Sequence, residues 1–258
     1  MEDAIFDPLA RGRTLLYYDQ RGGAGYPYAG DNPSDSHLLT LTADRHVQDL
    51  EVIRRHFGLR RMTIVGHSWG TGLAALYTHT YPDRVNRLLL VGPMPVRRKP
   101  HFEQFVSNLH REPPIGSLDL PGLAEHLEGA DSLSHGENVR VEPYWFNASC
   151  TSRDGDSRNT QVANETGWRS LGDWDWRPML STLEVPTLVV FGTSDNVPAA
   201  STEEWVESLP NARLLTFPGV GHFPHYEWPK QFYEAAESFL RGEWPPGARV
   251  RYRPRGGS

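Results

Sequence analysis

The sequence predicts an α/β fold built on a mostly parallel sheet with helices on its faces. Apolar runs of strand type at Met62 to Val65 and at Leu88 to Val91 alternate with segments of helical spacing, and the alternation resumes at Thr187. A glycine-flanked serine turn, Gly66-His67-Ser68-Trp69-Gly70, joins the first of these strands to a helix. Buried strands that alternate with helices form parallel sheets, which defines the fold class.

Length and composition are those of a globular protein, built either as one domain with an insertion or as two small domains. It has 258 residues, of which 38% are hydrophobic, enough to bury a sizeable core. A net charge of −6 favours neither nucleic acid nor an anionic membrane as a partner. The sequence has no apolar run of membrane-spanning length and begins MEDAIFDPLA, without a leader pattern, so we expect a cytoplasmic protein.

The N-terminal segments predict a helix, a strand and a longer helix. Residues Ala4 to Ala10 have the pattern of a helix end, and Thr14 to Tyr18 has the aromatic and β-branched composition of a strand. Thr42 is expected to cap a helix that ends at Gly58. One face of this helix is apolar, formed by Val47, Leu50, Ile53 and Phe57.

The second half of the chain predicts an inserted cap followed by a return to the sheet. From Pro95 to about Glu184 the regular alternation stops. It resumes with strands at 187–191 and 213–217 and helices at 201–209 and 229–242. We therefore expect a core of residues 1–94 and 185–242, a mainly helical cap of residues 95–184, and a flexible basic tail of residues 243–258.

Aromatic residues gather in the predicted cap and near its exit. Trp145 lies inside it, Trp168, Trp174 and Trp176 lie near its exit, and Phe223 follows the last strand. They can pack the cap onto the core, and some can line an apolar substrate pocket. The substrate-pocket residues predicted from this pattern are Trp145, Trp174, Trp176 and Phe223.

Ser68 is the candidate nucleophile. A serine on a sharp strand-to-helix turn takes a strained backbone conformation, and Gly66 and Gly70 are expected to leave room for it. The N–H of Trp69 then starts a helix and can stabilise an oxyanion. Cys150 is the only cysteine, so it forms no internal disulfide, and its WFNASCTS surroundings have no feature that activates a thiol.

A serine nucleophile needs a base, and the base needs an acid that fixes its tautomer. Asp195 follows the predicted strand at 187–191, and His222 follows the strand at 213–217. Both therefore lie at strand ends, where open α/β sheets bind ligands. The second choices are His225 as the base and Asp173 or Asp175 as the acid. This mechanism uses no metal or organic cofactor, and the partner is a small-molecule or short-peptide substrate.

Taken together, GHSWG after a buried strand, then GTSD, then GHFPH resemble the α/β-hydrolase fold. YYDQRGG and GHSWGTGLAALYTHTYPDRV are similar to its proline iminopeptidase-like branch. The resemblance covers nearly the whole chain and is weakest in the cap. It implies Ser68 as nucleophile, Asp195 as acid, His222 as base and the Trp69 N–H as one oxyanion donor.

Two departures from that branch affect the expected activity. The branch has a His-Gly-Gly-Pro-Gly loop that supplies a second oxyanion N–H, and we expect this chain to begin after that loop and after roughly the first three strands. Loss of one such donor costs about 2.7–4 kcal/mol of transition-state stabilisation. The branch also holds the substrate's amine with carboxylates from the cap, and no residue here matches them directly. The carboxylates considered for that role are Glu142, Glu165, Glu203 and Glu204.

Three functions therefore stay open at the level of sequence. A proline iminopeptidase-like aminopeptidase follows from the DQRG and GHSWGTGLA resemblance. A carboxylesterase or lactonase is compatible with the same nucleophile, acid and base. A non-catalytic ligand-binding homologue is the alternative from another class, because the expected oxyanion loop is absent.

Overall fold

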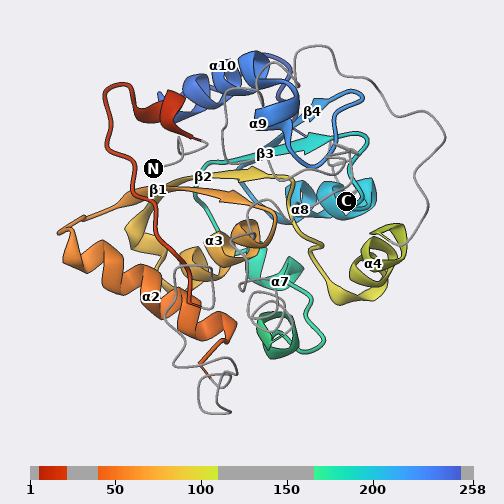
Figure 1. Cartoon of the computed structure of the whole chain (residues 1–258), viewed down its shortest axis with the longest axis horizontal. Helices are drawn as coiled ribbons and strands as arrows, with labels where there is room; N and C mark the ends of the chain where they lie inside the picture. The colour runs from red at the N-terminus through yellow and green to blue at the C-terminus, as the bar shows by residue number, and fades with distance from the viewer. Residues whose placement is uncertain (1–5, 22–39, 110–165, 251–258) are drawn as a thin grey trace, which may run out of the picture.

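The computed structural model describes residues 6–21, 40–109 and 166–250, and their centre is a parallel sheet (Figure 1). Four strands pair in the order β1-β2-β3-β4, and every pair is parallel. The strands are β1 Met62–His67, β2 Val85–Val91, β3 Thr187–Gly192 and β4 Ala212–Phe217. The α/β class and all four of these predicted strands are confirmed.

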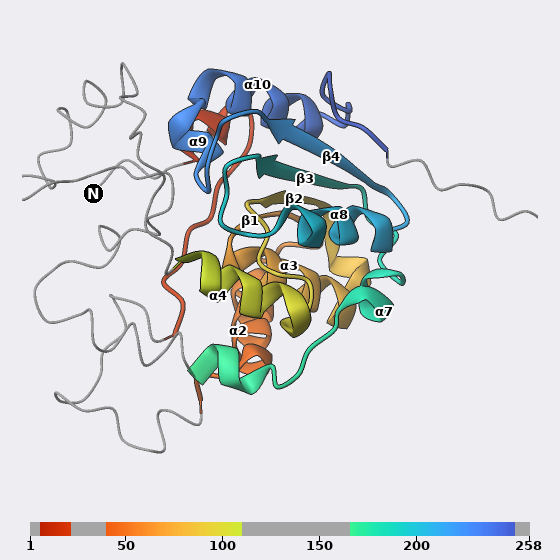
Figure 2. The same ribbon diagram turned by 90° about the vertical axis from the view of Figure 1, so that its right-hand side faces the viewer.

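Helices cover both faces of the sheet. The longer ones are α2 Ala43–His56, α3 Trp69–Thr80, α8 Ala199–Ser208 and α10 Pro229–Leu240. The shorter ones are η1 Asp7–Ala10, η2 Pro82–Arg84, η3 Arg98–Phe102, α4 Glu103–Leu109, α7 Arg177–Leu180 and α9 Pro224–Glu227. Figure 2 shows α10 on one side of the sheet and α2 and α3 on the other.

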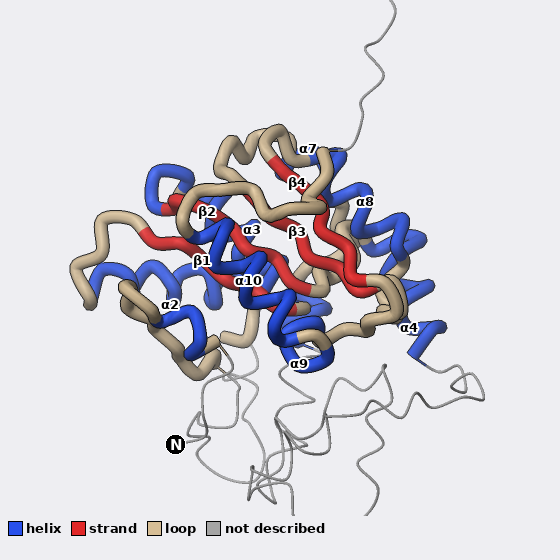
Figure 3. The backbone as a smooth tube through the Cα atoms, turned by 90° about the horizontal axis from the view of Figure 1, so that it is seen from above, coloured by secondary structure: helices blue, strands red, loops and turns tan. Residues whose placement is uncertain are grey.

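The alternation of side chains along the strands divides the core into two layers. Leu88 and Leu90 of β2 pack in the cluster that α2, α3 and α8 also form, whereas Leu89 and Val91 pack in the cluster of α10 and η1. Seen from above, α10 lies across the sheet (Figure 3). Coverage on both faces explains why β2 and β3 are continuous apolar runs instead of alternating ones.

The helix α2 begins and ends at the residues that its sequence indicates. The Thr42 hydroxyl accepts a hydrogen bond from the Arg45 N–H at 3.4 Å, and Gly58 takes a φ of +62° just after the helix. A side-chain cap satisfies an N–H that the helix itself leaves unpaired, and glycine adopts the left-handed conformation at low cost. The predicted boundaries of this helix are confirmed.

The predicted strand at Thr14 to Tyr18 is wrong. These residues carry no strand pairing, and Leu16 and Tyr17 are exposed by 41% and 50%. The segment instead crosses from the α10 side of the sheet, where Leu15 packs, to the α2 side, where Tyr18 packs (Figure 2). Its composition suits a strand, but a strand also needs a neighbour to pair with, and β1 pairs only with β2 among the described residues.

The predicted cap begins and ends in two segments that lie side by side. The Arg98 N–H donates to the Trp174 carbonyl at 2.9 Å, and the Trp176 N–H donates to the Val96 carbonyl at 3.1 Å. These two bonds flank an antiparallel bridge between Arg97 and Asp175. Residues 110–165 lie outside the described residues, and with them Trp145 and Cys150, so the cap boundaries stay a prediction.

The C-terminal segment is held against β4 as far as it is described. Arg249 and Leu214 exchange two backbone hydrogen bonds of 2.9 Å, and the Arg213 guanidinium lies 4.6 Å from the Trp244 ring centre. Within the described ranges, no helix combines the length and the apolar composition that crossing a membrane requires.

Candidate active site

The predicted site residues lie where the parallel strands end. Ser68 directly follows β1, Asp195 lies three residues after the end of β3, and His222 lies five residues after the end of β4. Gly92 follows β2 in the same way. Because parallel strands end at one edge of the sheet, these four positions come from separate parts of the chain to that edge.

Ser68 lies in a strained turn between β1 and α3. It has φ 53° and ψ −120°, and among the described residues it is the only non-glycine with positive φ. Its N–H donates to the Val91 carbonyl at 3.0 Å, which holds the turn against the end of β2. Strained conformations of this kind persist where the surroundings impose them and often mark functional positions.

The two glycines of the turn have different steric surroundings. A Cβ atom at Gly66 would lie 2.4 Å from the carbonyl oxygen of Gly70, so no side chain fits there. A Cβ atom at Gly70 would meet nothing within 4 Å. The expectation that both positions leave room for Ser68 therefore holds for Gly66 and not for Gly70.

Asp195 and His222 contact each other directly. His222 Nδ1 lies 2.8 Å from Asp195 Oδ2, and the other Asp195 oxygen accepts the Val197 N–H at 2.9 Å. The Asp195 side chain is fully buried and that of His222 is 8% exposed. A carboxylate only accepts hydrogen bonds, so Nδ1 carries the proton and Nε2 of the neutral ring carries the lone pair.

His222 also contacts the ends of the first two strands. The Nε2 atom of His67, the residue before Ser68, lies 2.9 Å from the His222 carbonyl oxygen. A Cβ atom at Gly92 would lie 3.1 Å from His222 Nδ1, so a larger residue there would push the ring away. His222 therefore contacts His67, within the serine turn, and lies close to Gly92, at the end of β2.

Two further histidines lie behind His222 and stay neutral. Burial, helped by His222 and His225, holds the pKa of His67 well below its usual value. Burial, helped by His222, lowers the pKa of His225 to about 3. The His225 ring packs 5.0 Å from His67 and 5.7 Å from Phe232, in the core beneath the site. The buried ring of His225 is therefore less suited than the ring of His222 to act as the base.

The main-chain N–H and the side chain of Trp69 have different surroundings. Trp69 is the first residue of α3, so its N–H belongs to the helix-start donors that lack a partner within the helix. Its indole N–H donates to Gln20 Oε1 at 3.2 Å, and its ring lies 5.7 Å from Trp168. An aromatic cluster continues from there through Phe102, 4.8 Å from Trp168.

The predicted pocket residues lie in different environments. Trp174 and Trp176 are each 6% exposed and pack in the core, where Trp174 donates to the Pro95 carbonyl and Trp176 lies 6.0 Å from Trp205. Phe223 packs 5.2 Å from the His222 ring and is half-buried. The packing interpretation therefore fits the two tryptophans, and a place beside the site fits Phe223.

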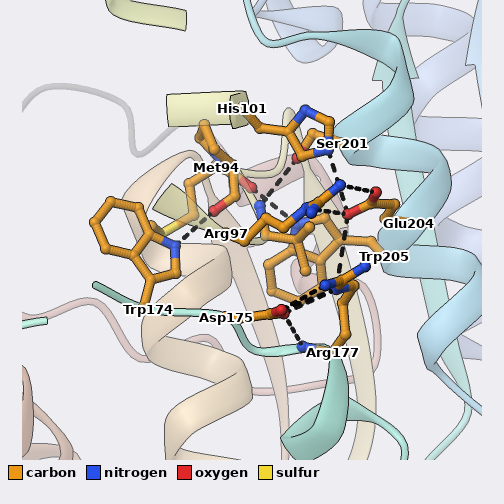
Figure 4. Close-up of polar contacts among 11 residues, drawn as sticks. Met94, Arg97, His101, Trp174, Asp175, Arg177, Ser201, Glu204 and Trp205 are labelled. Carbon is orange, nitrogen blue, oxygen red and sulfur yellow. Dashed lines mark hydrogen bonds and ion pairs between the residues drawn. The ribbon is translucent and has the colours of Figure 1, made fainter. Parts of the chain in front are cut away.

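The second-choice acids and Glu204 belong to other interactions. Asp173 is exposed, and Asp175 pairs with Arg177 at 2.5 Å, which lowers the pKa of Asp175. Glu204 accepts two hydrogen bonds from Arg97, at 2.9 and 2.6 Å (Figure 4). Burial raises the pKa of Glu204, but hydrogen bonds, the one from Arg97 foremost, bring it below its usual value. Glu142 and Glu165 lie outside the described residues.

The cluster in Figure 4 joins the entry and exit of the predicted cap to α8. Arg97 comes from the entry, Asp175 and Arg177 from the exit, and Glu204 from α8. His101 lies 3.3 Å from Glu204 in the same group. Half-buried pairs in such a network favour a fixed arrangement of the segments they join.

Sequence reasoning missed two residues around His222. The first is His67, whose Nε2 atom contacts the His222 carbonyl oxygen. The second is Glu227, whose carboxylate accepts the N–H groups of Gly221 and Phe223. A glutamate five residues after a candidate base, beyond a proline, is the signal that could have indicated it. In the part of the chain that the structure describes, no group of three or more His, Cys, Asp or Glu is placed to hold a metal ion.

The family described as alpha/beta hydrolase fold matches residues 1–131 of the chain. A protein named proline iminopeptidase from Lactobacillus helveticus is 25% identical over 259 residues, covering 92% of this chain and 83% of that protein. Another of that name, from Heyndrickxia coagulans, is 26% identical over 246 residues, with coverage of 90% and 83%.

Solved structures show the same fold. The crystal structure of a proline iminopeptidase from Mycobacterium smegmatis superposes with a TM-score of 0.63 at 21% identity, covering 92% of this chain and 84% of that one. A meta-cleavage product hydrolase from Pseudomonas fluorescens IP01 superposes with a TM-score of 0.61 at 20% identity, with coverage of 92% and 83%.

Proposed function

Because the chain belongs to the α/β-hydrolase fold family, we propose that it is a serine hydrolase that works through an acyl-enzyme intermediate. The observation that carries the proposal is the joint placement of Ser68 and the His222–Asp195 pair. Ser68 occupies the strained turn after β1, and the bonded pair lies at the ends of β3 and β4. A nucleophile, a base and an acid that orients the base are the parts that such a mechanism needs.

In the acylation step, the Ser68 oxygen attacks the substrate's carbonyl carbon and its proton passes to His222 Nε2. Asp195 stabilises the resulting imidazolium through the Nδ1 hydrogen bond. The bond from the carbonyl carbon to the leaving group then breaks, and the Nε2 proton passes to the leaving nitrogen or oxygen. Water, deprotonated by His222, then attacks the carbonyl carbon of the Ser68 ester. The bond from that carbon to Ser68 Oγ breaks, the proton on Nε2 passes to Oγ, and the acid is released.

The Trp69 N–H is proposed to stabilise the negative charge on the substrate's oxygen. It lies at the start of α3, directly after the nucleophile, where the helix dipole also favours a negative charge. Donors at this position are effective because they are fixed before the reaction begins.

For the substrate, we propose release of an N-terminal residue from a short peptide or a related small amide. The support is the similarity to proteins named proline iminopeptidase over 92% of the chain. The aromatic cluster of Trp69, Trp168 and Phe102 supports an apolar wall near the site. We propose a small molecule or short peptide as the only partner that the reaction needs.

Ester hydrolysis is the second candidate, and one observation favours it. Glu204, a candidate for binding a substrate's amine, is paired with Arg97. A carboxylate engaged in this way is not available to a substrate cation without losing its own partner. The same Ser68, His222 and Asp195 would then act on a small carboxylic ester or lactone.

The test compares two chromogenic substrates, proline p-nitroanilide and p-nitrophenyl butyrate, with the purified chain and its Ser68→Ala variant. Labelling by a fluorophosphonate, read by mass spectrometry, locates the reactive serine. We expect turnover and labelling in the native chain and neither in Ser68→Ala, and the preferred substrate then separates peptidase from esterase. Ligand binding without turnover or labelling would overturn the proposal in favour of a non-catalytic binding protein.

A further inference from the structure

Glu227 is the last residue of the short helix α9. Glu227 Oε2 accepts the N–H of Gly221 at 2.8 Å, and Oε1 accepts the N–H of Phe223 at 3.1 Å. These two residues are the immediate neighbours of His222 on either side. A single carboxylate thus holds the main chain both before and after the residue proposed as the base.

The local sequence explains how Glu227 reaches back. Pro224 begins α9, with Phe223 as the residue before the helix, and the N–H groups of Tyr226 and Glu227 both donate to the Phe223 carbonyl. This tight turn returns the chain towards the loop that precedes it. The contact is similar to a capping box, in which a glutamate accepts the N–H of the residue before the helix, but Glu227 lies four residues after Phe223 instead of three. Here the second oxygen extends that arrangement across His222 to Gly221.

The loop that carries His222 needs such support because it has no regular structure of its own. Residues 218–223 lie between β4 and α9 without helix or strand. His222 itself is also held by the Asp195 contact on Nδ1 and by the His67 contact on the carbonyl oxygen. Asp195 fixes the ring and His67 fixes the carbonyl, while the Glu227 carboxylate fixes the main chain on both sides.

The chemistry of the position supports a role beyond filling space. Burial raises the pKa of the Glu227 carboxyl, the backbone N–H groups of Gly221 and Phe223 oppose that rise, and Asp195 adds to it. A carboxyl group is therefore kept partly buried near a second carboxylate, which is an unfavourable place for negative charge.

We propose that Glu227 is a positioning residue for His222, which it holds in register with Asp195 and Ser68 through the N–H groups of Gly221 and Phe223. This rests on the proposed function, in which His222 moves the proton. A displacement of about 1 Å at a catalytic group costs on the order of 100-fold in rate, so a loop without this carboxylate would lower kcat. The apolar wall of Trp69, Trp168 and Phe102 is untouched, so KM would change less than kcat.

The main test compares Glu227→Gln, Glu227→Asp and native chain. Glutamine keeps the size, but its NH₂ group replaces one of the two acceptor oxygens and would face one of the N–H groups. Aspartate keeps the charge but is one methylene shorter. We expect kcat on the better chromogenic substrate to fall about 10- to 100-fold in both variants, with KM within about threefold. Glu234→Gln, an exposed change of the same charge on α10, is the control and keeps native kcat.

The pH profile of kcat/KM distinguishes an effect of the Glu227 charge from an effect of the loop geometry. Glu227→Gln removes the negative charge, so a displaced acid limb of kcat/KM in this variant would report an effect of the charge itself. Glu227→Asp retains the charge, so its acid limb stays near that of the native chain while kcat is still low. A residue that only supports the fold would lower the amount of folded enzyme without moving the profile.

A measurement on the ring itself keeps this test independent of turnover. In native chain labelled with ¹⁵N-histidine, the His222 Nδ1 proton bonded to Asp195 gives a downfield signal, assigned by its loss in His222→Gln. We expect that signal to broaden or disappear in both Glu227 variants while the circular dichroism spectrum stays native. If Glu227→Gln does not fold, Glu227→Asp provides the same comparison.

The outcomes are distinct. A native kcat, or an intact Nδ1 signal, in folded Glu227 variants would overturn the positioning role whatever the native chain hydrolyses. Absence of Ser68-dependent turnover in the native chain would overturn the proposed function, and the Nδ1 signal would still decide whether Glu227 positions His222.

Discussion

The ring of His67 donates a hydrogen bond from Nε2 to the carbonyl oxygen of His222 at 2.9 Å. A carbonyl oxygen only accepts, so the His67 proton lies on Nε2, in agreement with the low pKa that burial imposes on this ring. The residue before the candidate nucleophile thus holds the main chain of the candidate base. The candidate nucleophile and the candidate base are thus connected through the half-buried side chain of His67.

His67→Phe keeps a ring of similar size and removes the donor. The His222 carbonyl then lacks this partner, and we expect kcat to fall about 10-fold because the base is held less firmly. The measurement is kcat on the preferred chromogenic substrate, beside circular dichroism. His56→Gln at the exposed end of α2 is the control. An unchanged kcat in folded His67→Phe would mean that the hydrogen bond does not serve the base.

Asp195→Asn tests the acid. The amide oxygen can still accept the Val197 N–H, but its NH₂ group then faces His222 Nδ1 and favours the wrong ring tautomer. We expect kcat to fall about 10⁴-fold and fluorophosphonate labelling of Ser68 to slow in parallel. Asp173→Asn, at an exposed second-choice acid, is the matched variant. The assignment is wrong if Asp173→Asn is the change that abolishes labelling.

Gly66→Ala and Gly70→Ala form a pair with opposite expected effects on stability. The new methyl group at Gly66 would lie 2.4 Å from the Gly70 carbonyl oxygen, a main-chain atom that cannot move aside. We expect a loss of about 1–3 kcal/mol in the free energy of unfolding. At Gly70, the second residue of α3, the methyl group meets nothing within 4 Å. The higher helix propensity of alanine should therefore raise the free energy of unfolding by up to about 1 kcal/mol. Urea unfolding of both variants checks this, and equal effects would contradict it.

Glu51 makes the stability of the fold depend on pH. Its buried carboxylate accepts hydrogen bonds from Arg54, Arg55 and Tyr77. The Arg54 hydrogen bond, followed by those of Tyr77 and Arg55, overcomes the effect of burial and lowers the pKa of Glu51 from 4.5 to about 2. A lowered pKa means that the stabilisation is complete above pH 4.5 and is lost as the pH falls through about 2.

Removal of the Glu51 charge tests that dependence. Glu51→Gln leaves buried Arg54 without its carboxylate partner, and we expect the free energy of unfolding to fall by about 3 kcal/mol at neutral pH. The difference between variant and native chain should shrink as the pH falls from 4.5 towards 2, in urea titrations at several pH values. Glu234→Gln serves as the exposed control. A difference that stays constant across this window would contradict the account.

The sequence predicted the parts of the fold that local patterns encode. The four strands of the sheet, the Thr42 cap of α2 and the helix after Ser68 follow from apolar periodicity and capping residues. The Thr14 to Tyr18 segment shows the limit of this reasoning. Its composition favours a strand, but strand formation depends on a neighbouring strand, which no local pattern specifies.

By itself the sequence determined the fold class, the strained turn at Ser68 and the strand ends where Asp195 and His222 occur. These features arise from residues close together in the chain. Only the tertiary structure decided which residues surround His222. His67 and Gly92 reach it from the ends of other strands, and Glu227 reaches it through a turn of the main chain. Hydrogen bonds between distant residues depend on how the strands pack, and no periodicity in the sequence records them.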